Sequence, residues 1–238
     1  MGATSYTTLS RQSGLMREMR VVANNIANSA TTGYRSEGLI FSEYVQSSPG
    51  QQSLSMSRAN IYNTSLEQGQ LTKTGGTFDF AIEGEGFFMV ETPMGERLTR
   101  AGAFSPNAEG DLVTMDGYRV MDAGGSPVFV PGSAQSIEVG ADGTITADGN
   151  SIGQIGLFRP ADKNTMVRED GVMFRVEGDI DPAENVAMLQ GYTEGSNVNA
   201  IGQVTRMIEI QRAYEMGQSF LETEDRRIRD AIKNLIKS

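Results

Sequence analysis

The sequence contains no cysteine, no histidine and no tryptophan among its 238 residues. Without cysteine and histidine, the chain cannot form disulfides, thiol nucleophiles, imidazole bases, serine–histidine–aspartate triads or the usual zinc sites. Glycine, by contrast, is abundant, at 28 residues. We therefore expect no catalytic residue set, no metal site and no cofactor.

Long hydrophobic runs are also missing, and the longest apolar runs have four residues, as at 87–90. A membrane-spanning helix needs about 20 apolar residues, and the hydrophobic part of a secretory signal needs roughly 7–15. The sequence therefore predicts no membrane insertion. It also predicts that any export uses a route without a cleaved signal peptide.

Charge is distributed unevenly along the chain, whose net charge is −10. Residues 1–36 carry a net +3, residues 37–193 carry −13, and residues 194–238 are balanced. An acidic centre without a basic patch argues against nucleic acid as a partner. Because 22 of the 28 glycines also lie in 37–193, we expect two helical ends around a glycine-rich, strand-rich centre.

The N-terminal end has apolar residues at helical spacing from Ser5 to Asn28. The stripe consists of Leu9, Met16, Ala23 and Ala30, with Met19, Val22 and Ile26 beside it. The predicted helix ends before Gly33, which suits a left-handed turn. Asn24, Asn25 and Asn28 form an amide cluster that either fixes the register between packed helices or caps the helix end.

The C-terminal end shows the same periodicity more regularly, from about Asn197 to Lys237, with Ser196 as the expected N-cap. Its heptad stripe consists of Met207, Tyr214, Leu221, Ile228 and Leu235. Such a sustained repeat favours a supercoiled partner from another subunit. The alternative is that the two terminal helices pair with each other and complete a monomer, and the pattern alone leaves both interpretations open.

The centre is predicted to contain an extended connector at 37–76, with one or two short strands, followed by an all-β domain at 77–193. The expected strands are 78–83, 87–90, 98–104, 112–115, 118–121, 128–130, 136–139, 144–147, 152–158, 172–176 and 186–190. We therefore expect an α+β fold. Residues 1–36 and 194–238 would form a coiled-coil-like inner domain, with the central antiparallel β domain beside it.

Few residues of the centre suggest chemistry. Glu83 and Glu85 can be interpreted as a carboxylate pair, but glycines flank them at a strand end and solvation explains them. Asp142-Gly143 and Asp148-Gly149 resemble parts of calcium loops, yet they lack the twelve-residue ligand spacing and fit hairpin turns instead.

Several motifs, in order along nearly the whole chain, resemble the bacterial flagellar rod and hook proteins. At the N-terminal end they are Ala23-Asn24-Asn25-Ile26-Ala27-Asn28 and Thr31-Thr32-Gly33-Tyr34-Arg35. In the centre they are residues 80–88 and 99–104, and at the C-terminal end Glu194-Gly195-Ser196-Asn197-Val198-Asn199 and Gln211-Arg212-Ala213-Tyr214-Glu215. The short N-terminus and residues 220–227 resemble a proximal-rod member more than the distal-rod protein.

The resemblance implies a structural subunit of the proximal rod that polymerises through its terminal helices into a periplasmic, torque-transmitting shaft. Its partners would be other rod subunits, copies of itself and the flagellar type III export apparatus. The residues implied in subunit assembly are Met16, Met19, Ala23, Asn24, Asn25, Ile26, Asn28, Thr32, Gly33, Tyr34, Ser196, Asn197, Val198, Asn199, Met207, Gln211, Arg212, Tyr214, Glu215, Leu221, Ile228 and Leu235.

Three alternatives remain open at this point. The chain can be a distal-rod or hook-type axial protein, or a free-standing secreted binding domain whose helices pair internally. The third alternative is a hydrolase that uses Glu83 or Glu85, which predicts a pocket around these two residues.

Overall fold

The computed structural model describes residues 3–46 and 54–237, with side chains described for residues 7–40 and 63–233. The chain divides into two compact units. The helical unit comprises 1–29, 36–65 and 198–238, and the β unit comprises 30–35 and 66–197. The α+β fold with helices at both ends and a central antiparallel β domain is confirmed.

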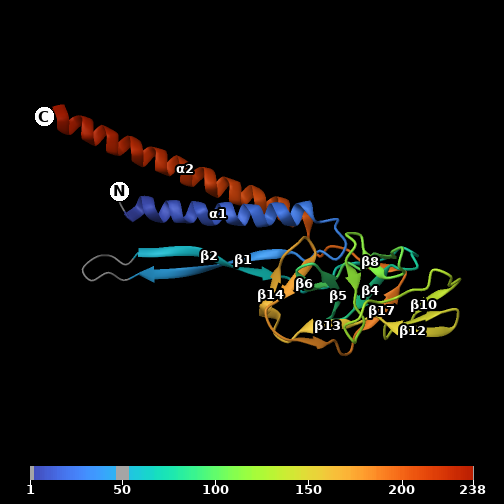
Figure 1. Cartoon of the computed structure of the whole chain (residues 1–238). Helices are drawn as coiled ribbons and strands as arrows, with labels where there is room; N and C mark the ends of the chain where they lie inside the picture. The colour runs from blue at the N-terminus through green and yellow to red at the C-terminus, as the bar shows by residue number, and fades with distance from the viewer. Residues whose placement is uncertain (1–2, 47–53, 238) are drawn as a thin grey trace. The chain divides into compact units, whose positions relative to one another are not determined.

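The helical unit is built from two long helices and one β-hairpin. Helix α1 (Ala3–Ala27) packs against α2 (Ala200–Lys237) on one side and against the hairpin of β1 (Glu37–Gln46) and β2 (Leu54–Thr64) on the other. Figure 1 shows α1 between α2 and the hairpin. Helix α1 is therefore covered on one face by α2 and on another by the hairpin, which explains why Val21 and Val22 are buried.

The hairpin occupies the start of the segment expected to be an extended connector with one or two short strands. Its strands pair antiparallel from Glu37 with Thr64 to Gln46 with Leu54, with a register shift between Ile40 and Phe41. With 10 and 11 residues, the strands are longer than the sequence pattern predicts. Serine and asparagine obscure the pattern, whereas pairing and packing on α1 extend the strands.

The boundaries of the two helices have local causes. Helix α1 ends at Ala27, where the Asn28 side chain donates to the Asn24 carbonyl at 2.9 Å and the Ser29 hydroxyl donates to the Ile26 carbonyl at 2.8 Å. Gly33, with a left-handed φ of +72°, lies six residues beyond this end. Helix α2 begins at Ala200 because the Asn199 side-chain oxygen accepts a hydrogen bond from the Gly202 N–H at 3.0 Å. The expected N-cap at Ser196 is therefore wrong, since the helix starts later than the apolar spacing suggests.

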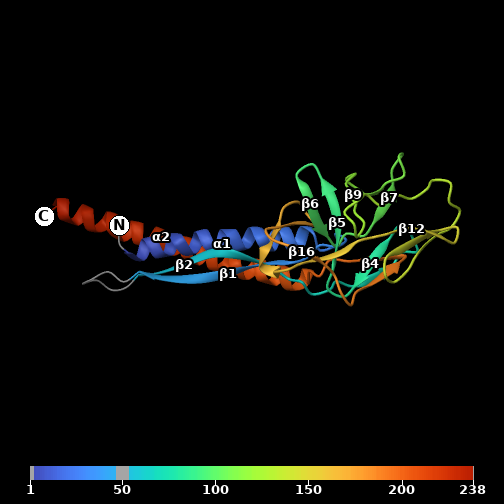
Figure 2. The ribbon, with the colours of Figure 1, turned by 60° about the horizontal axis from the view of Figure 1, so that its bottom comes forward.

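The β unit consists of short antiparallel strands. They are β3 (Leu71–Lys73), β4 (Phe80–Glu83), β5 (Phe87–Thr92), β6 (Gly95–Thr99), β7 (Phe104–Pro106), β8 (Leu112–Thr114), β9 (Arg119–Val120), β10 (Ile137–Val139), β11 (Thr144–Ala147), β12 (Asn150–Gln154), β13 (Leu157–Pro160), β14 (Met166–Arg168), β15 (Met173–Val176), β16 (Ile180–Pro182), β17 (Ala187–Gln190) and β18 (Tyr192–Glu194), with a 3-10 turn, η1 (Lys163–Thr165). Figure 2 shows β5 and β6 side by side within this unit.

One nine-stranded sheet carries most of these strands, in the order β14-β15-β6-β5-β9-β8-β7, with β13 and β16 joined to β5. Smaller pairings connect β17 with β4 and β18 with β3. The core lies against β4 and β5, where Phe80, Ile82, Phe88 and Val90 are almost fully buried. The residues between them, Ala81, Phe87 and Met89, are also buried, so both faces of these strands are covered.

Two expected strands are interrupted in the structure. The expected strand 98–104 splits into β6 and β7, because the Thr99 hydroxyl accepts from the Ala101 N–H and the Gly102 carbonyl accepts from the Phe80 N–H. The expected strand 152–158 splits into β12 and β13. Residues 128–130 form only an isolated bridge, Asp111 with Phe129, within the part of the chain that is described.

Candidate assembly interface

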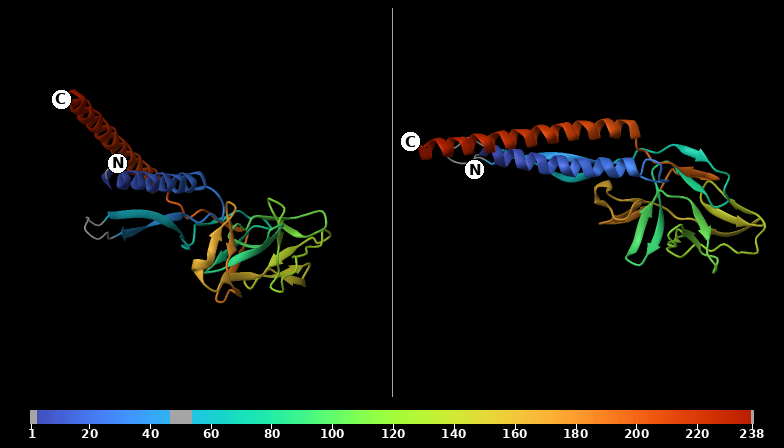
Figure 3. Two further views of the ribbon diagram at one scale, coloured as in Figure 1. Left: turned by 60° about the vertical axis from the view of Figure 1, so that its left-hand side comes forward. Right: turned by 90° about the horizontal axis from the view of Figure 1, so that it is seen from above.

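The two terminal helices run antiparallel in the helical unit, and specific contacts fix their register. Glu18 of α1 accepts a hydrogen bond from the Arg206 Nε of α2 at 2.7 Å, and Glu18 is 9% exposed. Further along the pair, a Cβ placed on Gly217 would lie 3.3 Å from the Gln12 side-chain nitrogen. The views in Figure 3 show the helices side by side.

Asn25 is the member of the asparagine cluster that has a packing role. It is 1% exposed, its Nδ2 donates to the Glu37 carbonyl at 2.8 Å, and its Oδ1 accepts from the Glu37 N–H at 3.0 Å. Its Nδ2 also lies 3.4 Å from Gln203 Oε1 on α2. Asn24 is exposed, and Asn28 donates to the Asn24 carbonyl at the helix end. One amide thus joins α1, α2 and the hairpin, while another caps the helix.

We expect Asn25→Leu to destabilise the helical unit by about 1–3 kcal/mol, because it removes the two hydrogen bonds that the buried Asn25 side chain makes with the Glu37 backbone. The expected result is faster amide hydrogen exchange at the start of β1 and in α1, with unchanged exchange in 78–190. The matched control is Asn24→Leu, since Asn24 is exposed one position away. Equal effects of the two substitutions would contradict this role of Asn25.

The face of α2 that contacts α1 contains three members of the predicted heptad stripe. The partly or fully buried residues of this face are Gln203, Met207, Ile210, Ala213, Tyr214, Gly217, Leu221 and Glu224. Met207, Tyr214 and Leu221 are therefore covered by packing within one chain, as the pairing alternative requires. Ile228 belongs to the same stripe and is nevertheless 46% exposed. Leu235 lies in α2, and its side chain is outside the described residues.

Other large apolar side chains of the helical unit remain exposed. On α1 they are Leu9 at 52% and Met16 at 41%. On α2 they are Ile201, Val204, Ile208, Met216, Phe220, Ile228 and Ile232, at 82%, 47%, 46%, 68%, 41%, 46% and 51%. At 100° per residue, Ile201, Val204 and Ile208 lie on a different side of α2 from the α1-facing residues Met207 and Ile210. Pairing of the two helices therefore leaves an apolar face uncovered.

The remaining residues predicted for assembly are divided between exposed and buried positions. Ala23, Asn199, Gln211, Arg212 and Glu215 are exposed. Met19, Ile26, Thr32, Ser196, Asn197 and Val198 are partly buried. Gly33 and Tyr34 are buried in the β unit. The predicted set is therefore two groups, one on the helices and one in the segments 30–35 and 194–197 of the β unit.

The second group surrounds a buried cluster of three charges. Glu194, 1% exposed, lies between Arg35 and Arg100, whose guanidinium nitrogens are each 2.9 Å from one of its carboxylate oxygens. The same carboxylate accepts from the Gly69 N–H at 2.9 Å, and the Glu194 carbonyl accepts from the Gly33 N–H at 2.7 Å. This cluster, which we call the Arg–Glu–Arg clasp, joins the segment after α1 to the segment before α2.

Burial dominates the electrostatics of the clasp. It lowers the pKa of Arg100 to about 10, while the Glu194 charge opposes the shift. It also lowers the pKa of Arg35, again against the attraction of Glu194. Because arginine keeps its charge in proteins, the clasp holds two positive charges around one negative charge. Removing Glu194 would leave both cations buried without the carboxylate that contacts them directly.

Arg35, Arg100 and Glu194 each lie within a sequence motif, but the sequence predicts no contact among them. They lie far apart in the chain, since Arg100 and Glu194 are separated by 94 positions. No periodicity connects such residues. A glutamate directly before a glycine, in a segment otherwise free of charge from 185 to 205, is the one local signal that points to a special role.

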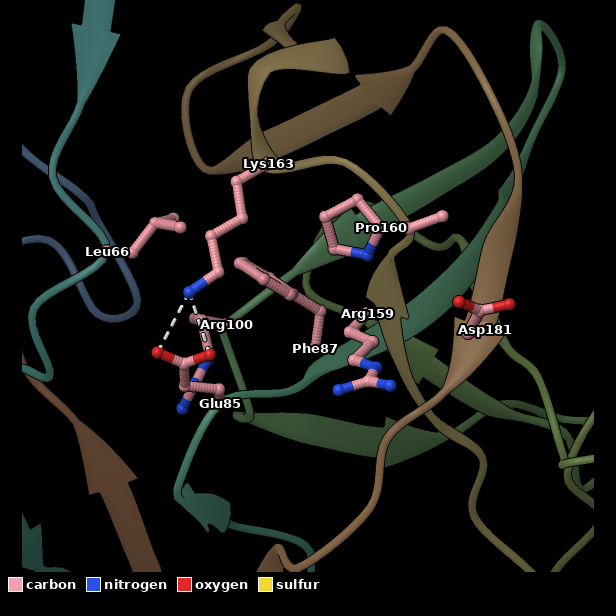
Figure 4. Close-up of a pocket in the computed structure, with 9 residues that line it drawn as sticks. Leu66, Glu85, Phe87, Arg100, Arg159, Pro160, Lys163 and Asp181 are labelled. Atoms are coloured by element: carbon pink, nitrogen blue, oxygen red, sulfur yellow. Dashed lines mark hydrogen bonds and ion pairs between the residues drawn. The ribbon is translucent and has the colours of Figure 1, made fainter.

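A pocket does lie beside Glu85, as the hydrolase alternative requires. Its volume is about 200 Å³, and Phe87, Arg100, Arg159 and Lys163 are among its lining residues. Figure 4 shows the Lys163 ammonium at the Glu85 carboxylate, with distances of 2.8 and 2.9 Å. The hydrogen bond from Lys163 lowers the pKa of Glu85. A general acid needs a raised pKa, and Glu83 does not line the pocket, so the arrangement does not favour hydrolysis.

Among the residues whose side chains are described, 7–40 and 63–233, no three acidic side chains cluster closely enough to ligate a metal. Within residues 3–46 and 54–237, no helix combines the length and the apolar character that a membrane crossing requires.

Comparison with known proteins gives three family matches in chain order. Residues 6–35 match the family described as flagella basal body rod protein, residues 81–147 match the flagellar hook protein FlgE/F/G D1 domain, and residues 189–234 match the flagellar basal body rod FlgEFG protein C-terminal family. These matches include most of the predicted assembly residues and all three members of the clasp.

Several curated relatives match this chain over nearly its whole length. The flagellar basal-body rod protein FlgF of Caulobacter vibrioides is 37% identical over 98% of this chain and 97% of its own length. The FlgF protein of Mesorhizobium japonicum is 35% identical over 97% of this chain and 96% of its own length. The rod protein FlgG of Agrobacterium fabrum is 35% identical over 91% of this chain and 93% of its own length. The chain therefore belongs to the family of flagellar basal-body rod proteins, together with FlgF, and is a structural subunit of the flagellar rod.

Proposed function

We propose that the paired terminal helices are the module through which this chain polymerises into the rod. One observation carries the proposal: Ile201, Val204 and Ile208 form an exposed apolar face on the side of α2 that α1 does not cover. Exposed patches of this kind mark interaction sites in soluble proteins. In a family of rod subunits, neighbouring subunits are the partners that would cover it.

The proposal explains why the heptad stripe of α2 continues beyond the residues that pack on α1 in the same chain. Part of the stripe stabilises the pair of helices, and the rest stays available for neighbours. Burying apolar side chains contributes about 25 cal/mol per Å², so several such residues supply several kcal/mol on assembly. We therefore expect the ends of the helices to become fully ordered only when neighbouring subunits cover them.

Further elements of the proposal rest on family membership and on the sequence. The partners would be other rod subunits, copies of this chain and the flagellar type III export apparatus. The location would be the periplasmic, proximal part of the rod, reached by export without a cleaved signal peptide. The function would be torque transmission by a structural protein, and the pocket at Glu85 would have no catalytic role.

We expect Ile208→Asp to abolish incorporation into rods and swimming, because a buried unpaired carboxylate at a subunit contact opposes assembly. The matched control is Gln218→Asp, which adds the same charge at an exposed polar position of α2. The measurements are the amount of the chain in isolated basal bodies and swimming of a strain that lacks the wild-type protein. Circular dichroism and segment-resolved hydrogen exchange should show that both variants fold. Normal incorporation of a folded Ile208→Asp variant would contradict the proposal.

A further inference from the structure

The helical unit has two exposed apolar features that are too far apart in one chain to contact each other. The first is a groove between α1 and α2, about 330 Å³ in volume, whose lining includes Leu15, Ala213, Met216, Gly217 and Phe220. The groove exists because Gly217 has no side chain and Ala213 a small one. Met216 and Phe220, one turn apart on its α2 side, are 68% and 41% exposed.

The second feature is the end of α2, which extends past the start of α1. Because Gln12 lies beside Gly217 in the antiparallel pair, the start of α1 at Ala3 is level with about Arg226. The part of α2 beyond this level, 227–237, therefore lacks α1 beside it, and Figures 1 and 3 show this extension. Ile228 and Ile232 continue the stripe that packs on α1, but they are 46% and 51% exposed.

The spacing of the two features matches. Ile228 and Ile232 are one helical turn apart, as are Met216 and Phe220, so the two pairs have the same geometry. On one straight helix the pairs are about 18 Å apart, so the end of α2 cannot reach the groove of its own chain. A second copy, parallel and shifted along the axis by this distance, brings Ile228 of one copy opposite Met216 of the other.

The charges of the same two stretches are complementary. Residues 214–225 contain Glu215, Glu222, Glu224 and Asp225 and no basic residue, a net charge of −4. The stretch that follows, 226–237, contains Arg226, Arg227, Arg229, Lys233 and Lys237 against Asp230, a net charge of +4. The same parallel shift lays the basic stretch along the acidic one. Arg11 of α1 also lines the groove and is basic. The groove therefore attracts the basic stretch 226–237 through the acidic residues of α2.

Resting on the proposed function, we propose that the end of α2 of one copy docks in the α1–α2 groove of a second copy, parallel to its α2 and with Ile228 opposite Met216. The contact joins two different surfaces, the α2 end and the groove, so it is heterologous. Heterologous contacts that do not close into rings generate open helical assemblies. The occupant of the groove is therefore a second copy of this chain, and each added copy uses one of the two surfaces and leaves the other free for the next copy.

The absence of cysteine allows a direct test by disulfide cross-linking. Met216→Cys with Ile228→Cys in one chain should give a ladder of linked dimers, trimers and larger species under mild oxidation. A link within the chain is impossible, because disulfides require Cα atoms within about 7 Å. The samples are the concentrated purified chain and isolated basal bodies. The matched control, Gln218→Cys with Ile228→Cys, should link at least about tenfold more slowly, since undocked thiols lack the high effective concentration of docked ones.

The competing outcomes each overturn part or all of the proposal. Faster linking of Met216→Cys with Ile232→Cys, ending at dimers, would show an antiparallel closed contact. Equal linking of the Gln218→Cys control, or no linked product in either sample, would show that the groove does not receive the α2 end. Linking that does not slow as salt rises would contradict the charge complementarity. If Ile208→Asp blocks incorporation while the pair at 216 and 228 fails to link, the helical module stands and this contact is wrong.

Discussion

Glu194→Ala is expected to lower the free energy of unfolding of the β unit by about 3–5 kcal/mol, because it removes the carboxylate that lies 2.9 Å from each of two buried guanidinium groups. The side chains of Arg35 and Arg100 are 1% and 3% exposed, so water cannot replace the carboxylate without opening the structure. The substitution also removes the acceptor of the Gly69 N–H. The loss is a large share of the roughly 5–15 kcal/mol that typically stabilises a domain.

The measurement is segment-resolved hydrogen exchange of the full chain, because the two units can unfold separately and one overall transition would mix them. Protection should fall in 66–197 and in 30–35. The matched control is Glu85→Ala, which breaks an ion pair whose side chains are 75% and 55% exposed. Exposed pairs contribute about 0–1 kcal/mol. A small effect of Glu194→Ala, similar to that of Glu85→Ala, would contradict the stabilising role of the clasp.

A substitution at Gly33 should be nearly as damaging, for a different reason. Gly33 has φ of +72°, and an added Cβ would lie 2.2 Å from the Ala101 backbone nitrogen and 2.4 Å from the Arg100 carbonyl carbon. A left-handed conformation costs a residue with a side chain roughly 1–2 kcal/mol, and overpacking adds about 1–3 kcal/mol. We therefore expect Gly33→Ala to lower the stability of the β unit by about 3 kcal/mol or more.

Gly117→Ala separates these two contributions. Gly117 has φ of +85°, but nothing lies within 4 Å of an added Cβ. This control should lower the free energy of unfolding only by the cost of the left-handed conformation, about 1–2 kcal/mol. The readouts are hydrogen exchange in 30–35 and 99–104 and incorporation into isolated rods. Equal losses for the two variants would show that backbone strain alone matters at Gly33 and that its close approach to residues 100–101 does not.

The sequence alone determines the features that depend on local physics. Helical periodicity identifies both terminal helices, and short apolar segments between turns identify most strands of the β unit. The hairpin turns expected at Asp142-Gly143 and Asp148-Gly149 also follow from local rules, since Gly143 and Gly149 have positive φ in the structure. The flagellar family is also recognisable from ordered motifs, because each motif is contiguous in the chain.

Tertiary structure alone decides which partner covers each apolar face. Periodicity shows that Met207, Tyr214 and Leu221 share a side of α2, but it cannot tell that α1 covers them while Ile208 stays exposed. The N-cap at Asn199 and the hydrogen bonds of Asn25 with Glu37 likewise depend on where elements meet. The Arg–Glu–Arg clasp is the clearest case. A charge can be buried only where opposite charges from distant segments converge, and the fold creates that convergence.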